Sequence, residues 1–223
     1  MKGTLLHRDF HSPALGERRG YVVYLPAGHV SGRRFPTLYL LHGALDWERT
    51  WVEKGDLCDA VERSGRELIV VMPAENGALL RGDTRVADYL ARDLVGHVDF
   101  EYPTLADRRH RALDGLSTGG FTSLVVGAWR PNVFASIGSM SGSHDARSFE
   151  AVRACAGDMR DQRYLVSYGH GEPNVDTVRA LHRVLGEQGI ECGLADAPGG
   201  HDWPLWRAIL PAHLAFHGES FAR

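Results

Sequence analysis

The chain has 223 residues, of which 43% are hydrophobic and 24% charged, proportions that are ordinary for a globular protein with a sizeable core. A formal net charge of −3 offers no basic surface for nucleic acid, and no apolar run approaches the roughly 18 residues that a membrane-crossing helix needs. The three cysteines, Cys58, Cys155 and Cys192, are far apart and odd in number, so we expect no disulfide framework and a reducing, cytoplasmic compartment.

The hydrophobic pattern along the chain predicts alternating strands and helices. The first residues, Met1 to Asp9, contain no apolar core of a signal peptide. Most of the later strand segments are continuous apolar runs, which is typical of strands buried on both faces. The expected strands cover residues 4–10, 19–25, 35–43, 67–73, 111–116, 134–140, 163–168 and 190–195. Helices are expected over residues 55–64, 87–101, 121–129, 175–188 and 203–217.

This alternation predicts a three-layer α/β fold with a mostly parallel central sheet of about eight strands. The first two segments are joined without a helix, which favours an antiparallel start. We see no repeat, low-complexity tract or linker, so we expect one domain over residues 1–223. No long insertion separates the strands at 134–140 and 163–168, so we expect little or no cap and an open site.

The stretch Gly115-Leu-Ser-Thr-Gly119 has the G-x-S-x-G pattern of a nucleophile elbow, between an apolar strand and an apolar helix. A serine raised above a sheet must sit on a very tight turn, and residues two before and two after it have almost no room for side chains. Gly115 and Gly119 meet this need, and Gly120 lets the helix pack close to the strand. The pattern predicts Ser117 as a nucleophile.

A serine hydroxyl needs a general base and a group that orients the base. His201 is the favoured base because it follows the last strand, in a glycine-rich loop on the rim where Ser117 lies. The orienting acid is expected after the strand at 163–168, where Glu172 and Asp176 are the candidates. We favour Glu172, because Asp176 is placed to open a helix as a first-turn acid.

An oxyanion hole requires two backbone N–H groups aimed at the developing negative charge. Thr118, directly after the nucleophile, is expected to supply one. Ala44, after the strand that ends Leu40-Leu-His-Gly43, is expected to supply the other. We interpret His42 as a structural polar group of that turn rather than a second base.

Other kinds of site fit the sequence poorly. There is no phosphate-binding G-x-x-x-x-G-K-[S/T] loop, and the cysteines lack metal-ligand spacing, so no cofactor and no metal are expected. His213 and His217 have zinc-like spacing but no adjacent glutamate. These two, with three other histidines, are expected at solvated helix or loop positions: His97, His110 and His182. The tryptophans near the rim could line a pocket or pack in the core: Trp47, Trp51, Trp203 and Trp206.

With these residues in place, the chain resembles the branch of the α/β-hydrolases that includes esterase D (S-formylglutathione hydrolase), tributyrin, feruloyl and enterochelin esterases and the antigen 85 mycolyltransferases. The resemblance covers nearly the whole chain, and Pro198-Gly-Gly-His-Asp-Trp203 is its specific part. It implies Ser117 as nucleophile, His201 as base, and Ala44 and Thr118 as oxyanion donors. The family usually has Asp where this chain has Glu172. Relatives in this branch often dimerise, so a homodimer is one assembly that the resemblance implies.

The sequence is compatible with three functions. The first is a cofactor-free serine carboxylesterase that hydrolyses small acyl or aryl esters through an acyl-enzyme on Ser117. The second is an acyltransferase of the antigen 85 type, in which an alcohol replaces water and every catalytic residue is shared. The third is a catalytically inactive binding protein, against which the intact Ser117 and His201 argue.

Overall fold

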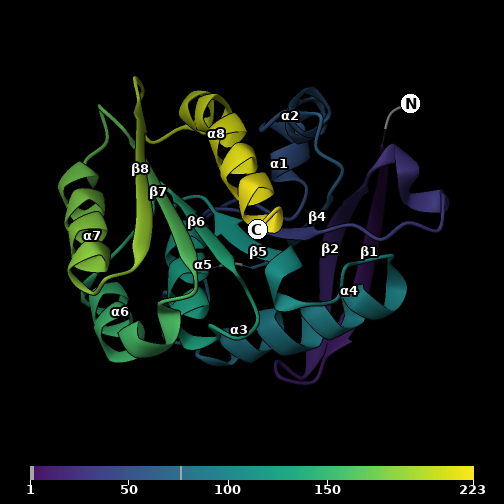
Figure 1. Cartoon of the computed structure of the whole chain (residues 1–223), viewed down its shortest axis with the longest axis horizontal. Coiled ribbons are helices and arrows are strands. Elements are labelled where there is room, and N and C mark those ends of the chain that lie inside the picture. Colours follow the sequence, from purple (N-terminus) through teal and green to yellow (C-terminus); the bar gives the residue numbers. More distant parts are fainter. Residues whose placement is uncertain (1–2, 76) are drawn as a thin grey trace.

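The computed structural model describes residues 3–75 and 77–223, so Met1 and Lys2 of the first segment lie outside the described residues. Eight strands form one sheet in the order β1-β2-β4-β3-β5-β6-β7-β8 (Figure 1). The strands are β1 Thr4–Ser12, β2 Glu17–Leu25, β3 Thr37–Leu41, β4 Ile69–Pro73, β5 Arg111–Gly115, β6 Ser136–Met140, β7 Arg163–Gly169 and β8 Glu191–Ala197.

The sheet begins antiparallel and continues parallel. β1 pairs with β2 from Thr4 opposite Leu25 to Ser12 opposite Glu17, and β2 pairs antiparallel with β4. Each remaining neighbour pair, from β4–β3 to β7–β8, is parallel. The predicted fold class is therefore confirmed, including the antiparallel start and the number of strands.

Helices cover both faces of this sheet (Figure 1). On one face lie α1 Thr50–Glu53, α2 Leu57–Ser64 and α8 Trp203–Phe221. On the other face lie α3 Arg85–Asp88, the π-helix η2 Tyr89–Leu94, α4 Val95–Glu101, α5 Thr118–Trp129, α6 Ala146–Met159 and α7 Val175–Glu187. Two short 3-10 helices, η1 Ala27–Val30 and η3 Arg108–His110, lie in connections.

Successive side chains of the central strands point to opposite faces of the sheet and pack into two separate hydrophobic cores. In β5, Leu113 points into the core beneath α3 to α7, whereas Ala112 points into the core beneath α8. Both residues are fully buried, as expected for a strand with helices on either side. The sheet thus separates the two cores, and polar loops follow the carboxyl ends of its parallel strands.

Two features of the helices depart from the expected pattern. Apolar residues do not recur at a clear helical spacing over α6, because two of its four buried positions are Ser148 and Ala151. The helix begins with a capping box between Asp145 and Ser148. The helix expected over residues 87–101 is a composite in which η2 separates α3 from α4.

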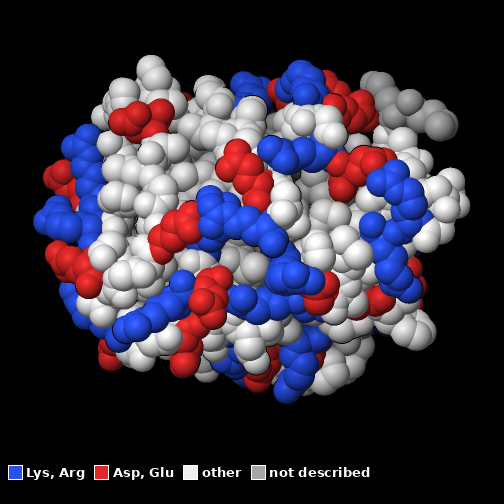
Figure 2. All heavy atoms as spheres, in the orientation of Figure 1, with Lys and Arg blue, Asp and Glu red and all other residues white. Residues whose placement is uncertain are grey.

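The surface carries both signs of charge. On the face seen in Figure 1, basic and acidic side chains are interspersed (Figure 2). None of the described helices combines the length and apolar character that crossing a bilayer requires.

Candidate active site

Ser117 occupies the turn between β5 and α5. Its backbone has φ 54° and ψ −116°, a conformation that non-glycine residues rarely adopt. Its N–H donates to the carbonyl of Met140 at 2.9 Å. A Cβ at Gly119 would lie 2.4 Å from the carbonyl oxygen of His42, and one at Gly115 would lie 2.6 Å from the carbonyl carbon of Gly119. The glycine spacing thus has the steric cause expected from the sequence.

Three predicted side chains meet above the carboxyl ends of the parallel strands. Nε2 of His201 lies 2.9 Å from Oγ of Ser117, and Nδ1 of His201 lies 2.9 Å from Oε1 of Glu172. The Glu172 side chain is fully buried, whereas that of His201 is one-third exposed at 33%. Asp176 lies apart from the imidazole, exposed in the first turn of α7.

The loops that carry Glu172 and His201 are bound to each other. Gly169 and Ala197 are the last paired residues of β7 and β8, so both loops leave the sheet at one level. Beyond them, Gly171 N–H donates to the carbonyl of Gly199 at 2.9 Å. The second carboxylate oxygen of Glu172 accepts the N–H of Gly169 at 2.8 Å. A backbone N–H of its own loop therefore fixes the Glu172 carboxylate, and the other carboxylate oxygen is available to the His201 imidazole.

A hollow of about 410 Å³ opens beside Ser117 and His201. Ala44 lies in its wall, and Thr118 is the first residue of α5, where helix N–H groups have no partner within the helix. Neither backbone N–H donates to another described residue. Ala44 therefore borders the hollow and Thr118 directly follows Ser117, and neither N–H is used by another described backbone group.

The rim tryptophans divide between the two roles that the sequence leaves open. Trp51 is fully buried, and its Nε1–H donates to the carbonyl of Leu41 at 3.0 Å. Trp203 and Trp206 line the hollow, and the Trp206 ring meets the His201 ring edge-on at 5.1 Å. Trp47 is exposed.

His42 lies in the turn before Ala44. It is buried, and it binds the Gly43 carbonyl through Nδ1 at 2.8 Å and accepts the N–H of Glu75 at 3.1 Å. These bonds fit the structural role expected for it.

Sequence reasoning missed the loop that follows β6. Oγ of Ser143 lies 3.4 Å from Oγ of Ser117, and its N–H donates to the Ser117 carbonyl at 3.1 Å. The side-chain amide of Asn174 donates to the carbonyls of Ser141 and Gly142, both at 3.1 Å. The sequence could have indicated this loop. A strand parallel to β5, as β6 is, has its carboxyl end at the same edge of the sheet, so the loop after it lies near Ser117.

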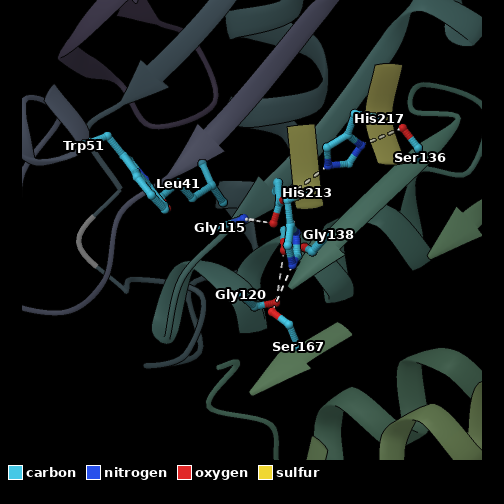
Figure 3. Close-up of polar contacts among 11 residues, drawn as sticks. Leu41, Trp51, Gly115, Gly120, Ser136, Gly138, Ser167, His213 and His217 are labelled. Atoms are coloured by element: carbon cyan, nitrogen blue, oxygen red, sulfur yellow. Dashed lines mark hydrogen bonds and ion pairs between the residues drawn. The ribbon is translucent and has the colours of Figure 1, made fainter. Parts of the chain in front are cut away.

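The expectation that His213 and His217 are solvated is wrong. Both imidazoles are buried, at 1% and 0% exposed, because α8 turns this side of its surface onto the sheet. There they bind Asp114 of β5 (Figure 3). Two histidines on the helix after the last strand are most simply interpreted as solvent-exposed. The buried carboxylate that binds them, that of Asp114, lies 99 and 103 residues away in the sequence.

The chain is similar in sequence and in fold to known proteins. The chain is 26% identical over 93% of its length to an endo-1,4-beta-xylanase/feruloyl esterase of Xylanibacter ruminicola, and it spans 30% of the length of that relative. Among solved structures, a ferulic acid esterase superposes with a TM-score of 0.88 at 23% identity, covering 98% of this chain and 99% of the other. An S-formylglutathione hydrolase of Staphylococcus aureus superposes with a TM-score of 0.85 at 17% identity, covering 98% of each chain.

These solved structures share the fold of this chain. The family model described as "Putative esterase" matches residues 12–217, which include every residue of the site described above. The chain therefore belongs to this esterase family of α/β-hydrolase fold.

Proposed function

We propose that the protein is a serine carboxylesterase in which Ser117 is the nucleophile, His201 the general base and Glu172 the orienting acid. The observation that carries this proposal is the continuous chain of contacts from Glu172 through His201 to Ser117, with both distances 2.9 Å. Nucleophile, base and orienting group within hydrogen-bond reach of one another are the geometric requirement for acyl transfer through serine.

The acylation step follows from these contacts. Oγ of Ser117 attacks the ester carbonyl carbon while its proton passes to Nε2 of His201. The buried carboxylate of Glu172 accepts the Nδ1–H bond and stabilises the imidazolium as it forms. The N–H groups of Ala44 and Thr118 receive the negative charge that develops on the carbonyl oxygen.

The tetrahedral intermediate then collapses. The bond between the carbonyl carbon and the alcohol oxygen breaks, and the imidazolium returns its proton to the departing alkoxide. Water attacks the acyl-enzyme by the same route: it gives a proton to His201, and Ser117 Oγ leaves and takes that proton back. Acid, alcohol and free enzyme are the products.

The size and lining of the hollow support a small substrate. Its volume of about 410 Å³ and its lining by Leu116, Trp203 and Trp206 suit a small acyl or aryl group more than a long, branched one. The names of the similar proteins, feruloyl esterase and S-formylglutathione hydrolase, also support a small acyl group, which is an aryl acyl group in the first and a formyl group on sulfur in the second.

The decisive experiment compares the wild-type protein with Ser117→Ala in hydrolysis of p-nitrophenyl acetate. Loss of the nucleophile should lower kcat by several orders of magnitude, on the order of 10⁶ if it follows the subtilisin series in which triad members were removed. A fluorophosphonate should label the wild-type protein at Ser117.

Ser143→Ala is the matched control, because it removes the neighbouring hydroxyl and leaves the three-residue relay in place. We expect it to retain kcat to within about tenfold, since a single hydrogen bond at this length is weak. Undiminished hydrolysis by Ser117→Ala would remove the basis of the proposal.

A further inference from the structure

Asp114 is a fully buried carboxylate beside the elbow, and it serves as the centre of a polar cluster. Its Oδ1 accepts the N–H of Gly115 at 2.7 Å. Its Oδ2 accepts from Nδ1 of His213 at 2.7 Å and from Nε2 of His217 at 2.9 Å (Figure 3). All three ionisable side chains are at most 1% exposed. One carboxylate oxygen therefore binds two successive turns of α8.

The outer side of each imidazole is bonded as well. Nε2 of His213 lies 2.9 Å from Oγ of Ser167 in β7, and Nδ1 of His217 lies 2.8 Å from Oγ of Ser136 in β6 (Figure 3). Every ring nitrogen thus has a partner at hydrogen-bond distance. The two imidazoles connect α8 to three adjacent strands at once, and hydrogen bonds are directional, so the helix has one position that satisfies them all.

Packing around the carboxylate is equally restrictive. A Cβ at Gly138 of β6 would lie 2.1 Å from the Asp114 carboxyl group. Burial acts to raise the pKa of Asp114, but the charge and hydrogen bonds of His213 and His217 outweigh it and hold that pKa at about 2. A carboxylate buried without these imidazoles would be costly, so the cluster favours only the arrangement in which α8 is fully docked.

Ser117 and His201 are both attached to this cluster. Asp114 stands three residues before Ser117 on the same strand and turn. On the side of His201, α8 begins directly after that residue: Asp202 caps the helix by accepting the N–H of Leu205 at 3.2 Å. In its first turns, Trp206 packs on the His201 ring and donates to Ser141 Oγ at 3.1 Å. A shift of α8 would therefore move the imidazole relative to the serine.

We propose that Asp114, His213 and His217 are positioning residues that fix α8 against β5 and so set the distance between His201 and Ser117. The inference rests on the proposed function, because it assigns these residues a task in that relay. They touch neither the hollow nor the reacting atoms, and they act through the helix. A misplacement of about 1 Å at a catalytic group can cost about 10²-fold in rate, so small displacements of α8 suffice.

The test uses a matched pair of substitutions at position 217. His217→Gln keeps an N–H donor near the place of Nε2, whereas His217→Leu keeps bulk and removes the bond to Asp114. For p-nitrophenyl acetate we expect His217→Leu to lower kcat about 10- to 100-fold with KM changed less than about threefold. The rate of fluorophosphonate labelling at Ser117 should fall in parallel, and His217→Gln should recover most of both.

Leu214→Ala controls for general loosening of the helix, because Leu214 is 1% exposed on α8 but lies outside the polar cluster. All assays are run well below the midpoint of thermal unfolding of each variant. We expect Leu214→Ala to lower that midpoint while kcat stays within about threefold of wild type. Equal losses of kcat in Leu214→Ala and His217→Leu would overturn the inference, as would a wild-type kcat in His217→Leu.

Should His217→Leu yield no folded protein, the double variant Ser136→Ala/Ser167→Ala loosens the same cluster from its outer side and should lower kcat about 3- to 10-fold. An unchanged kcat in that variant would contradict the inference. Failure of the proposed function itself would appear separately, as hydrolysis that survives Ser117→Ala.

Metal content forms a second arm, because the ligand atoms of Asp114, His213 and His217 lie within 4.8 Å of one another. A hydrogen-bonded cluster predicts no stoichiometric metal in the purified wild-type protein and no effect of a chelator on kcat. Stoichiometric zinc that His217→Leu abolishes would overturn the inference in favour of a metal centre.

Discussion

The Glu172 carboxylate is held in one orientation by two hydrogen bonds, one to each oxygen. Replacing it with Gln keeps the size of the side chain and removes the charge that stabilises an imidazolium. We expect Glu172→Gln to lower kcat about 10³- to 10⁴-fold with a small change in KM, by analogy with the trypsin-type Asp→Asn variant. Steady-state hydrolysis of p-nitrophenyl acetate measures both constants.

Asp176→Asn is the control, because Asp176 is the other acid that the sequence offers and is exposed on α7. Its substitution should leave kcat within about twofold. The reverse result, a large loss in Asp176→Asn alone, would reassign the acid.

His144 gives a separate prediction about stability. It is buried between Ser139 Oγ at 3.0 Å and Ser148 Oγ at 3.3 Å, and burial lowers its pKa to about 3. An unfolded chain holds this group near a pKa of about 6.5. Between these values the unfolded state binds a proton that the folded state does not, so stability falls as pH falls from about 6.5 toward 3.

We expect His144→Gln, which keeps a polar side chain without the titration, to reduce this pH dependence by about 1.4 kcal/mol per pH unit within that window. Urea unfolding at several pH values between 4 and 7 gives the free energies of unfolding. Parallel profiles for the two proteins would show that His144 does not titrate as its burial requires.

At the scale of elements, one glycine in α4 and one in α5 should respond in opposite ways to alanine. Gly119 in α5 has no room for a Cβ, because backbone oxygens of β3 and its turn lie within 3.0 Å of that position. Gly96 in α4 is exposed, and nothing lies within 4 Å of the place of its Cβ. Gly96→Ala should therefore raise the free energy of unfolding by about 0.5–1 kcal/mol.

Gly119→Ala should lower the free energy of unfolding by several times that amount, because backbone atoms cannot move aside as a flexible side chain can. Thermal and urea unfolding of the two variants provide the comparison. A neutral Gly119→Ala would mean that the elbow relaxes more freely than its contacts allow.

The elements that were predictable from the sequence are those with strong local signals. The apolar runs that became β3 to β7 and the glycines around Ser117 are read within a few residues of the chain. Helix α6 was not predicted, because only two of its four buried positions, Val152 and Met159, carry larger apolar side chains, and its capping box gives the main clue. The roles of Ser143 and Asp114 depend on neighbours 26 and 99 residues away, which no local pattern reports.

At the scale of the whole molecule, the sheet divides two cores that should nevertheless unfold together. Leu113 belongs to the core under α3 to α7, and Leu214 belongs to the core under α8. Leu113→Ala and Leu214→Ala should each cost about 2–5 kcal/mol of unfolding free energy. The double variant should show the sum, because the sheet separates the two sites.

Near-ultraviolet circular dichroism and tryptophan fluorescence measure this unfolding with different probes. Four of the five tryptophans lie on the α8 side or the rim, and Trp129 packs against the other core. Coincident transitions are expected in both single variants. Two separate transitions would show that the cores unfold independently.

The contacts of α8 also have a consequence for how the chain acquires reactivity. His201 meets Ser117 across 84 residues of sequence, and Asp114 meets His213 and His217 across 99 and 103. Contacts so distant along the chain form late, because a long loop must close first. Refolding from urea should therefore yield a compact intermediate that does not hydrolyse esters. Hydrolysis should begin only in the last kinetic phase, when α8 packs against the sheet.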